Sequence, residues 1–236
     1  MKKDYPDLSD LEKKLEYTFK NKELLRGALI HTSYANEHSR GNYVVKSNER
    51  IEFLGDSVLG LATGSYIYKN YPDMPEGRMS KLRASVVCES TLADVAFLIG
   101  LDKYLMLGVG EEQTGGRKKP SILSDALESV FAAIYLDSGY DVAQAAVLRL
   151  IVPEIIKRVD NFVLSDYKST LQEICAKKHL SVSYSVIAES GPEHNRIFTA
   201  KAVVSDGKFA LGEGKSKKDA EQIAAAELLR IFKTED

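Results

Sequence analysis

Apolar residues recur every three or four positions through most of the first 159 residues, as they do along one face of a helix. This spacing predicts helices over residues 8–17, 23–29, 51–68, 80–99, 123–136 and 142–159. Loops that contain Gly or Pro, such as "NYPDMPEG" and "DSGY", separate these segments. The first part of the chain is therefore expected to be all-helical.

The pattern changes near residue 160. A helical segment at 167–180 precedes three stretches in which apolar and polar residues alternate, at 182–189, 196–204 and 208–214. An Ala-rich segment with strong helix propensity, 215–232, follows them. We expect an all-α domain at 1–159, a linker at 160–166 and an α-β-β-β-α domain of the α+β class at 167–236.

Composition adds little to this picture. Of the 236 residues, 44% are hydrophobic and 28% charged, as in ordinary globular proteins. The two cysteines, Cys88 and Cys175, lack the spacing of a disulfide framework or a zinc site and fit a reducing compartment. No apolar signal segment and no apolar run of roughly 20 residues is present, so we expect a cytoplasmic protein without a membrane partner. The net charge of −2 gives no overall sign of nucleic-acid binding.

The stretch "NERIEFLGDS" at 48–57 carries three carboxylates, Glu49, Glu52 and Asp56, in a segment predicted to be helical. On a helix the three lie within roughly 60° of one another, and the apolar residues occupy the opposite arc. The usual interpretation is a solvated acidic face. However, no basic residue stands one turn along to pair with the acids, and the small residues Gly60 and Thr63 leave room above them.

A second helical segment repeats this arrangement. In "SILSDALESVFAAIYLDSG", Asp125 and Glu128 are three residues apart and share a face that Ala132 continues. Two such helices can converge into a cluster of four carboxylates, whose mutual repulsion a divalent cation would relieve. Oxygen ligands favour Mg²⁺ or Mn²⁺, and such a site can activate water and stabilise charge on a phosphate under attack.

These segments resemble the signature sequences of bacterial ribonuclease III. The stretch "NERIEFLGDS" carries the resemblance together with "HTSYANE" (31–37), "PEGRMSKLRAS" (75–85) and "SILSDALESVFAAIYLD" (121–137), in the order of that family. The resemblance implies a homodimeric all-α endonuclease domain with Mg²⁺-dependent cleavage of double-stranded RNA, in which Mn²⁺ can substitute. It also implies 5′-phosphate and 3′-hydroxyl ends with short 3′ overhangs, and processing of ribosomal RNA precursors. By position it implies four metal ligands, Glu52, Asp56, Asp125 and Glu128, and two supporting acids, Glu49 and Glu76.

Residues 165–233 resemble the double-stranded RNA-binding domain, most specifically in the pattern Gly-x-Gly-x-Ser-Lys-Lys-x-Ala-Glu at 212–221. Lysines at a helix N-terminus oppose the helix dipole, so this arrangement makes sense if they and the helix start hold phosphate together. The resemblance implies three RNA-binding regions, which contain Gln172 and Glu173, His194, and Lys215, Lys217 and Lys218. Residues 164–236 hold 11 basic and 11 acidic side chains, so net charge alone gives no sign of this domain.

Other residues have plainer interpretations. His31 beside Thr and Ser is typical of a structural or capping histidine. Lys81, Arg83 and the loop "TGGRKKP" fit either RNA phosphate contacts or ordinary solvated surface. Phe53 projects near the acidic stripe, away from the apolar face. It is expected to anchor a two-fold dimer, as the resemblance also implies, and the alternative is packing under a neighbouring helix of its own subunit.

The combined interpretation is an endoribonuclease for double-stranded RNA. One alternative is a catalytically silent RNA-binding scaffold, against which the four intact carboxylate positions argue. Another is a metal-dependent hydrolase of small phosphate esters, which leaves the RNA-binding domain unexplained. A cleavage assay with and without Mg²⁺ separates the three.

Overall fold

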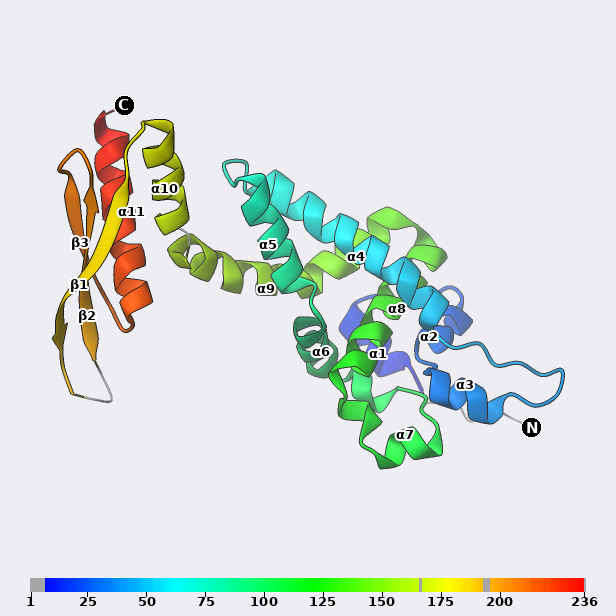
Figure 1. Cartoon of the computed structure of the whole chain (residues 1–236). Helices are drawn as coiled ribbons and strands as arrows, with labels where there is room; N and C mark the ends of the chain where they lie inside the picture. The colour runs from blue at the N-terminus through cyan, green and yellow to red at the C-terminus, as the bar shows by residue number, and fades with distance from the viewer. Residues whose placement is uncertain (1–6, 166, 193–195, 236) are drawn as a thin grey trace. The chain divides into compact units, whose positions relative to one another are not determined.

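The computed structural model describes residues 7–165, 167–192 and 196–235 (Figure 1). The chain divides into two structural units, Met1–Ile156 and Lys157–Asp236. The prediction of a helical half followed by an α-β-β-β-α half is confirmed. None of the described helices is both long and apolar enough to cross a membrane.

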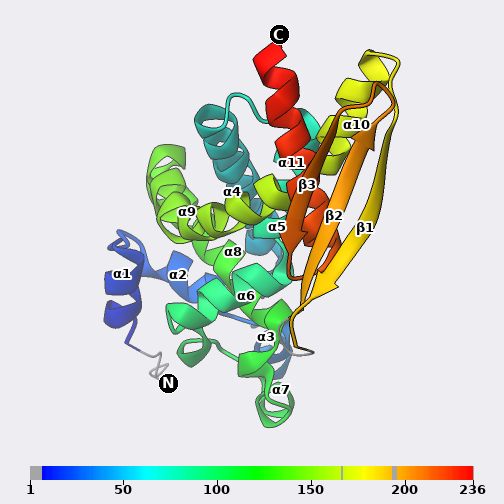
Figure 2. The ribbon, with the colours of Figure 1, turned by 90° about the vertical axis from the view of Figure 1, so that its left-hand side faces the viewer.

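Helices joined by loops make up the first unit, and the last of them, α9 (Tyr140–Ser165), continues past Ile156 into the second unit. The helices of the first unit are α1 (Ser9–Leu15), α2 (Lys22–Ala28), α3 (Thr32–His38), α4 (Glu49–Asn70), α5 (Glu76–Val86), α6 (Glu89–Leu98), α7 (Val109–Gln113), α8 (Pro120–Ser138) and α9, with short 3-10 turns η1 (Leu101–Lys103) and η2 (Gly116–Lys118). Helix α8 is the centre of the core, because it packs against α2, α4 and α6 (Figure 2). Its apolar residues from Ile122 to Ile134 are buried.

One helix prediction was wrong. Residues 80–99 were expected to form a single helix, but α5 ends at Val86 and α6 begins at Glu89. Two β-branched residues in succession, Val86 and Val87, lower the helix propensity there. The carbonyl of Ser85 accepts a hydrogen bond from the Thr91 hydroxyl at 3.1 Å, which stabilises the break.

The segment 160–166, expected to be a linker, is helical as far as Ser165 in α9. The sequence pattern changes from all-helical to mixed around this segment, which suggested a boundary. A change of pattern does not by itself end a helix, because helix propensity varies little among most residue types.

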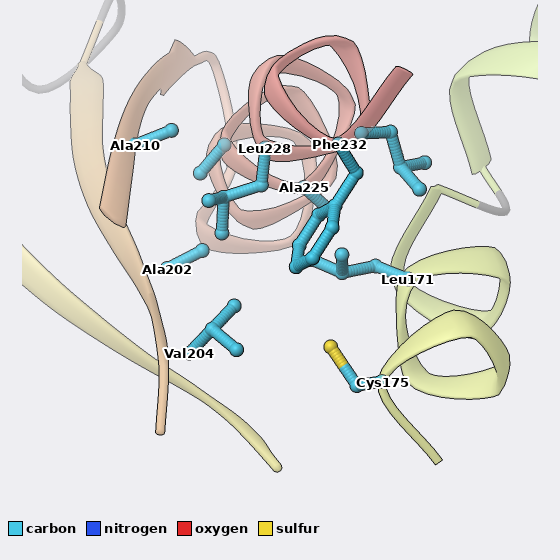
Figure 3. Close-up of a cluster of buried hydrophobic side chains, with 10 residues drawn as sticks. Leu171, Cys175, Ala202, Val204, Ala210, Ala225, Leu228 and Phe232 are labelled. Atoms are coloured by element: carbon cyan, nitrogen blue, oxygen red, sulfur yellow. The ribbon is translucent and has the colours of Figure 1, made fainter. Parts of the chain in front are cut away.

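The second unit contains α10 (Tyr167–Lys177), β1 (Val182–Ser190), β2 (Ile197–Val204), β3 (Phe209–Gly214) and α11 (Lys217–Glu235). The strands form an antiparallel sheet in the order β1-β2-β3, with a bulge in β1 between Val186 and Ala188. Helices α10 and α11 cover one face of the sheet, and a buried apolar cluster lies between the helices and the strands (Figure 3). The labelled members are Leu171, Cys175, Ala202, Val204, Ala210, Ala225, Leu228 and Phe232.

Candidate active site

The acidic residues of the first unit meet where α4 crosses α8. A Cβ atom built on Gly55 would lie 2.0 Å from the carbonyl oxygen of Glu128 and 2.4 Å from its carbonyl carbon. Only a residue without a side chain allows this backbone contact. Asp56 follows Gly55, and Glu52 lies one turn earlier, so the close approach brings the α4 acids beside Glu128.

The electrostatics of the four predicted ligands reflect this convergence. Burial raises the pKa of Glu128 to about 8, with further contributions from Asp56, Glu52 and Asp125. Burial also raises the pKa of Glu52, again with the repulsion of Asp125, Glu49 and Asp56. The two acids of each helix are therefore within electrostatic range of the other helix. This cross-helix coupling is the one that the sequence pattern predicted.

Asp125 has a more mixed environment. Burial raises its pKa, the Ser124 hydroxyl lowers it by hydrogen bonding at 3.2 Å, and the charges of Glu89 and His31 act in opposite directions. Glu89, the first residue of α6, was not among the predicted site residues. Its sequence position gives no signal, because its effect on Asp125 arises from the packing of α6 against α8.

The donor set fits a hard divalent cation. All four groups are carboxylates, and no lysine or arginine is among the causes that shift the pKa of Glu52, Asp125 or Glu128. Over the described ranges, no three His, Cys, Asp or Glu side chains converge into metal-ligand geometry as they stand. The four carboxylates thus share one region without forming a closed cage, and their assignment as ligands stays a prediction.

The two supporting acids occupy different places. Glu49 begins α4, accepts a hydrogen bond from the Ser47 hydroxyl at 2.7 Å and raises the pKa of Glu52. Glu76 begins α5 and accepts from the Ser80 hydroxyl at 2.7 Å. It lines a cavity of about 380 Å³ between α4 and α5. The structure thus brings Glu49 to the cluster and gives Glu76 a separate setting.

Phe53 lies on the same helix with its ring in solvent. Its side chain is 78% exposed, so it does not pack under a neighbouring helix of its own subunit. Exposed apolar residues continue along α4 at Leu61 and Tyr68, and both of these line the cavity that contains Glu76. This face of α4 is apolar and accessible.

His31 and two cations of the loop 114–120 make structural contacts. The His31 side chain accepts a hydrogen bond from the Ser33 backbone N–H at 3.2 Å and caps α3. Arg117 donates to the backbone carbonyls of Asp102 and Leu105 at 2.8 and 3.0 Å. Lys119 pairs with Glu111 at 2.6 Å. The loop 114–120 is therefore held by its own cations.

The predicted lysine cluster of the second unit stands at the start of α11. Ser216 caps this helix: its hydroxyl accepts the Asp219 N–H at 3.1 Å and donates to the Asp219 carboxylate at 2.7 Å. The side chains of Lys215, Lys217 and Lys218 are exposed around that cap. The three lysines therefore stand at the end of the helix whose first backbone N–H groups have no partner within the helix itself.

Two glycines hold α11 against the sheet. A Cβ at Gly212 would lie 2.2 Å from the backbone nitrogen of Ala224, and one at Gly214 would lie 2.5 Å from that of Ala220. The Gly-x-Gly pattern is thus required for backbone contact, and this contact fixes where the lysines emerge.

The other predicted RNA-binding residues are on α10 and in the β1–β2 loop. Gln172 and Glu173 are exposed on α10. His194 lies outside the described residues.

Known proteins share both units. Residues 21–155 match the family model described as Ribonuclease-III-like, and residues 167–231 match the Double-stranded RNA binding motif. The Ribonuclease 3 of Listeria monocytogenes is 44% identical over 217 residues, which cover 92% of this chain and 93% of that protein. The chain belongs to the ribonuclease III family.

Further relatives agree. The Ribonuclease 3 of Caldanaerobacter subterraneus is 44% identical over 226 residues, or 94% of this chain and 96% of that protein. The solved nuclease domain of ribonuclease III from Campylobacter jejuni, which has a region involved in dimer formation, matches with 43% identity and a TM-score of 0.57, over 62% of this chain and 97% of that chain. The protein is therefore an endoribonuclease specific for double-stranded RNA, from a family that is generally metal-dependent.

Proposed function

We propose that this protein is a Mg²⁺-dependent endonuclease that hydrolyses both strands of double-stranded RNA to 5′-phosphate and 3′-hydroxyl ends with short 3′ overhangs. The observation that carries the proposal is the backbone contact of Gly55 with Glu128, which gathers two acid pairs beside one another. Ribosomal RNA precursors and other structured transcripts are the cellular substrates that we infer from the family.

In this proposal Glu52, Asp56, Asp125 and Glu128 hold the metal, and Mn²⁺ can replace Mg²⁺ because both prefer oxygen ligands. The bound metal supplies an activated water and stabilises charge on the phosphate under attack. Glu128 has to release the proton that its environment favours before it can act as a ligand. Glu49 adds negative charge beside Glu52, and Glu76 is assigned a supporting role near the RNA.

The division of labour follows the two domains. We assign catalysis to residues 1–159, the joint to 160–166 and duplex binding to 167–236. Lys215, Lys217 and Lys218 bind phosphate at the start of α11, Gln172 and Glu173 contact the duplex from the first helix of the domain, and His194 enters a minor groove. Such contacts read the A-form shape and the 2′-hydroxyls more than the base sequence.

We further propose that the working enzyme is a homodimer anchored by Phe53. A large exposed ring without a place in its own subunit is typical of an interface residue. In a two-fold dimer each ring enters the partner, and the cavity beside Leu61 and Tyr68 offers it an apolar place. Each subunit then brings one carboxylate cluster, so that each cluster cuts one strand.

The test is the substitution Glu128→Gln, with Glu23→Gln as the control because Glu23 is exposed on α2 and is not among the groups that shift the pKa of Glu52, Asp125 or Glu128. Cleavage of a long RNA duplex is measured with and without Mg²⁺, beside single-stranded RNA and duplex DNA. Glu128→Gln should abolish cleavage and leave duplex binding in Ca²⁺ unchanged. Near-normal turnover of Glu128→Gln refutes the ligand assignment.

The wild-type protein decides between the alternatives in the same assay. Duplex binding without cleavage in Mg²⁺ indicates a silent scaffold. Hydrolysis of a small phosphate ester without duplex cleavage indicates the other hydrolase.

A further inference from the structure

The chain leaves α2 along a path on which each backbone carbonyl has a donor. The carbonyl of Arg26 accepts from the Leu29 N–H at 3.1 Å, that of Gly27 from Ile30 at 3.3 Å and that of Leu29 from Met106 at 2.8 Å. The last carbonyls of a helix have no partner inside it, so donors from elsewhere are needed. The two remaining carbonyls, those of Ala28 and Ile30, both accept hydrogen bonds from one residue.

That residue is Asn48, whose side chain is 5% exposed. Its side-chain amide donates to the Ala28 carbonyl at 3.2 Å, and its backbone N–H donates to the Ile30 carbonyl at 2.8 Å. Asn48 therefore forms hydrogen bonds with the segment at the end of α2 through both its side chain and its main chain.

Asn48 also stands directly before α4, where an asparagine normally caps the helix. Here its side chain makes no capping hydrogen bond, and its backbone is already helical, with φ −77° and ψ −8°. An N-cap asparagine ordinarily has an extended backbone and accepts from an N–H of the first turn. The amide is used instead to reach Ala28.

The carbonyl of Asn48 continues the connection toward the acidic cluster. It accepts from the backbone N–H groups of Ile51 and Glu52, both at 2.8 Å. The buried hydroxyl of Ser129 reaches the same carbonyl at 3.5 Å, the outer limit of a hydrogen bond. Ser129 follows Glu128, so Asn48 contacts the helix that carries the opposite pair of acids.

We propose that Asn48 is a positioning residue, which sets the first turn of α4, with Glu52, relative to Glu128 on α8. The inference rests on the proposed function of the carboxylate cluster. Removing the side-chain donor leaves the fully buried Ala28 carbonyl without a partner and frees the start of α4 to shift. Substituting a residue that orients metal ligands without contacting the metal typically changes metal affinity or activity by about 10–100-fold.

Two substitutions separate this role from ordinary helix capping. Asp and Ser are as good as Asn at an N-cap, so capping alone predicts that Asn48→Asp and Asn48→Ser are nearly neutral. Neither reproduces the amide that donates to Ala28. Asn48→Ser is the decisive variant, because it buries no new charge and adds none to the cluster.

The control is Asn70→Ser at the other end of α4. The Asn70 amide also donates to a backbone carbonyl, that of Tyr66 at 2.9 Å, but it is exposed. We expect Asn48→Ser to weaken Mn²⁺ binding, followed by electron paramagnetic resonance, by about ten-fold or more. Turnover should fall while the KM for duplex RNA stays constant, and the metal-free protein should exchange the Ile51 and Glu52 amide hydrogens faster. Asn70→Ser should change none of these.

The result that overturns the inference is a lower melting temperature for Asn48→Ser with unchanged Mn²⁺ affinity and unchanged turnover per folded molecule, because that pattern describes a structural residue only. Glu128→Gln is measured beside it. If Glu128→Gln is inactive and Asn48→Ser is normal, the inference alone fails. If Glu128→Gln is active, the proposed site itself is wrong.

Discussion

The contact between α4 and α8 can be tested by adding one methyl group. In Gly55→Ala the new Cβ would start 2.0 Å from the Glu128 carbonyl oxygen, whereas ordinary van der Waals contact begins at 3.4 Å. To restore ordinary contact, the two helices must therefore separate by about 1.4 Å along that direction. Even the shortest contact that real Cβ atoms make, 3.0 Å, requires a separation of about 1.0 Å. The atom in the way belongs to the backbone, so no side-chain rotation can relieve the clash.

Stability and catalysis should respond to different extents. Overpacking of this kind typically costs about 1–3 kcal/mol, and the better helix propensity of Ala offsets about 1 kcal/mol of it. The net loss in the free energy of unfolding is then about 2 kcal/mol or less. Displacing a catalytic group by about 1 Å can lower the rate by about 100-fold. Cleavage should thus fall much further than stability does.

The control is Gly110→Ala in α7, which lies outside the acidic cluster and outside the cavity beside Leu61 and Tyr68. A Cβ there has no atom within 4 Å, so the substitution should raise the free energy of unfolding by up to about 1 kcal/mol and leave cleavage unchanged. Urea denaturation gives the stabilities, and single-turnover cleavage of an RNA duplex in saturating Mg²⁺ gives the rates. Equal cleavage rates for the two folded variants would refute the claim that this contact positions the acids.

Three further predictions concern charge and assembly. The environment of Glu128 raises its pKa from 4.5 to about 8 in the folded metal-free protein, so the free energy of unfolding should fall as the pH rises from about 4.5 to about 8. The loss is on the order of 1–2 kcal/mol after allowance for solvent screening, and Glu128→Gln should flatten the slope in urea titrations. The double substitution Lys217→Ala and Lys218→Ala should weaken duplex binding for all sequences and lower the salt slope of binding by about one unit per lysine, and a constant slope contradicts the phosphate contacts. Phe53→Ala should shift the dimer toward monomer in sedimentation and turn paired cleavage into nicking, whereas an unchanged dimer excludes the anchor role.

The fold followed from the sequence to the extent that it depends on periodicity. Helical spacing located α4, α8 and α9, and alternation located the three strands, because burial on one face imposes these periods. The break between α5 and α6 was missed. It depends on a hydrogen bond from Thr91 to Ser85, which a hydrophobic pattern does not record.

The candidate site shows a similar limit. Spacing along each helix identified the two acid pairs, since residues three or four apart share a helical face. Spacing could not show that Gly55 brings the pairs together or that Asn48 reaches Ala28, because both contacts join segments that are distant in sequence. Sequence spacing did not identify Glu89 as a site residue for the same reason. Its effect on the pKa of Asp125 arises from how α6 packs, not from any local pattern.

In both units, close backbone packing at glycines holds side chains of one charge near one another, carboxylates in the first unit and lysines in the second. In the first, Gly55 allows two helix backbones to touch, and four carboxylates are brought into mutual repulsion. In the second, Gly212 and Gly214 allow α11 to rest on β3, and lysines surround a helix end that already carries partial positive charge. Each arrangement is unfavourable for the isolated protein, and close packing of the backbone maintains it. A partner of opposite charge removes the cost in each case, a divalent cation among the carboxylates and RNA phosphate among the lysines, so the unfavourable charge patterns themselves argue for the two binding functions.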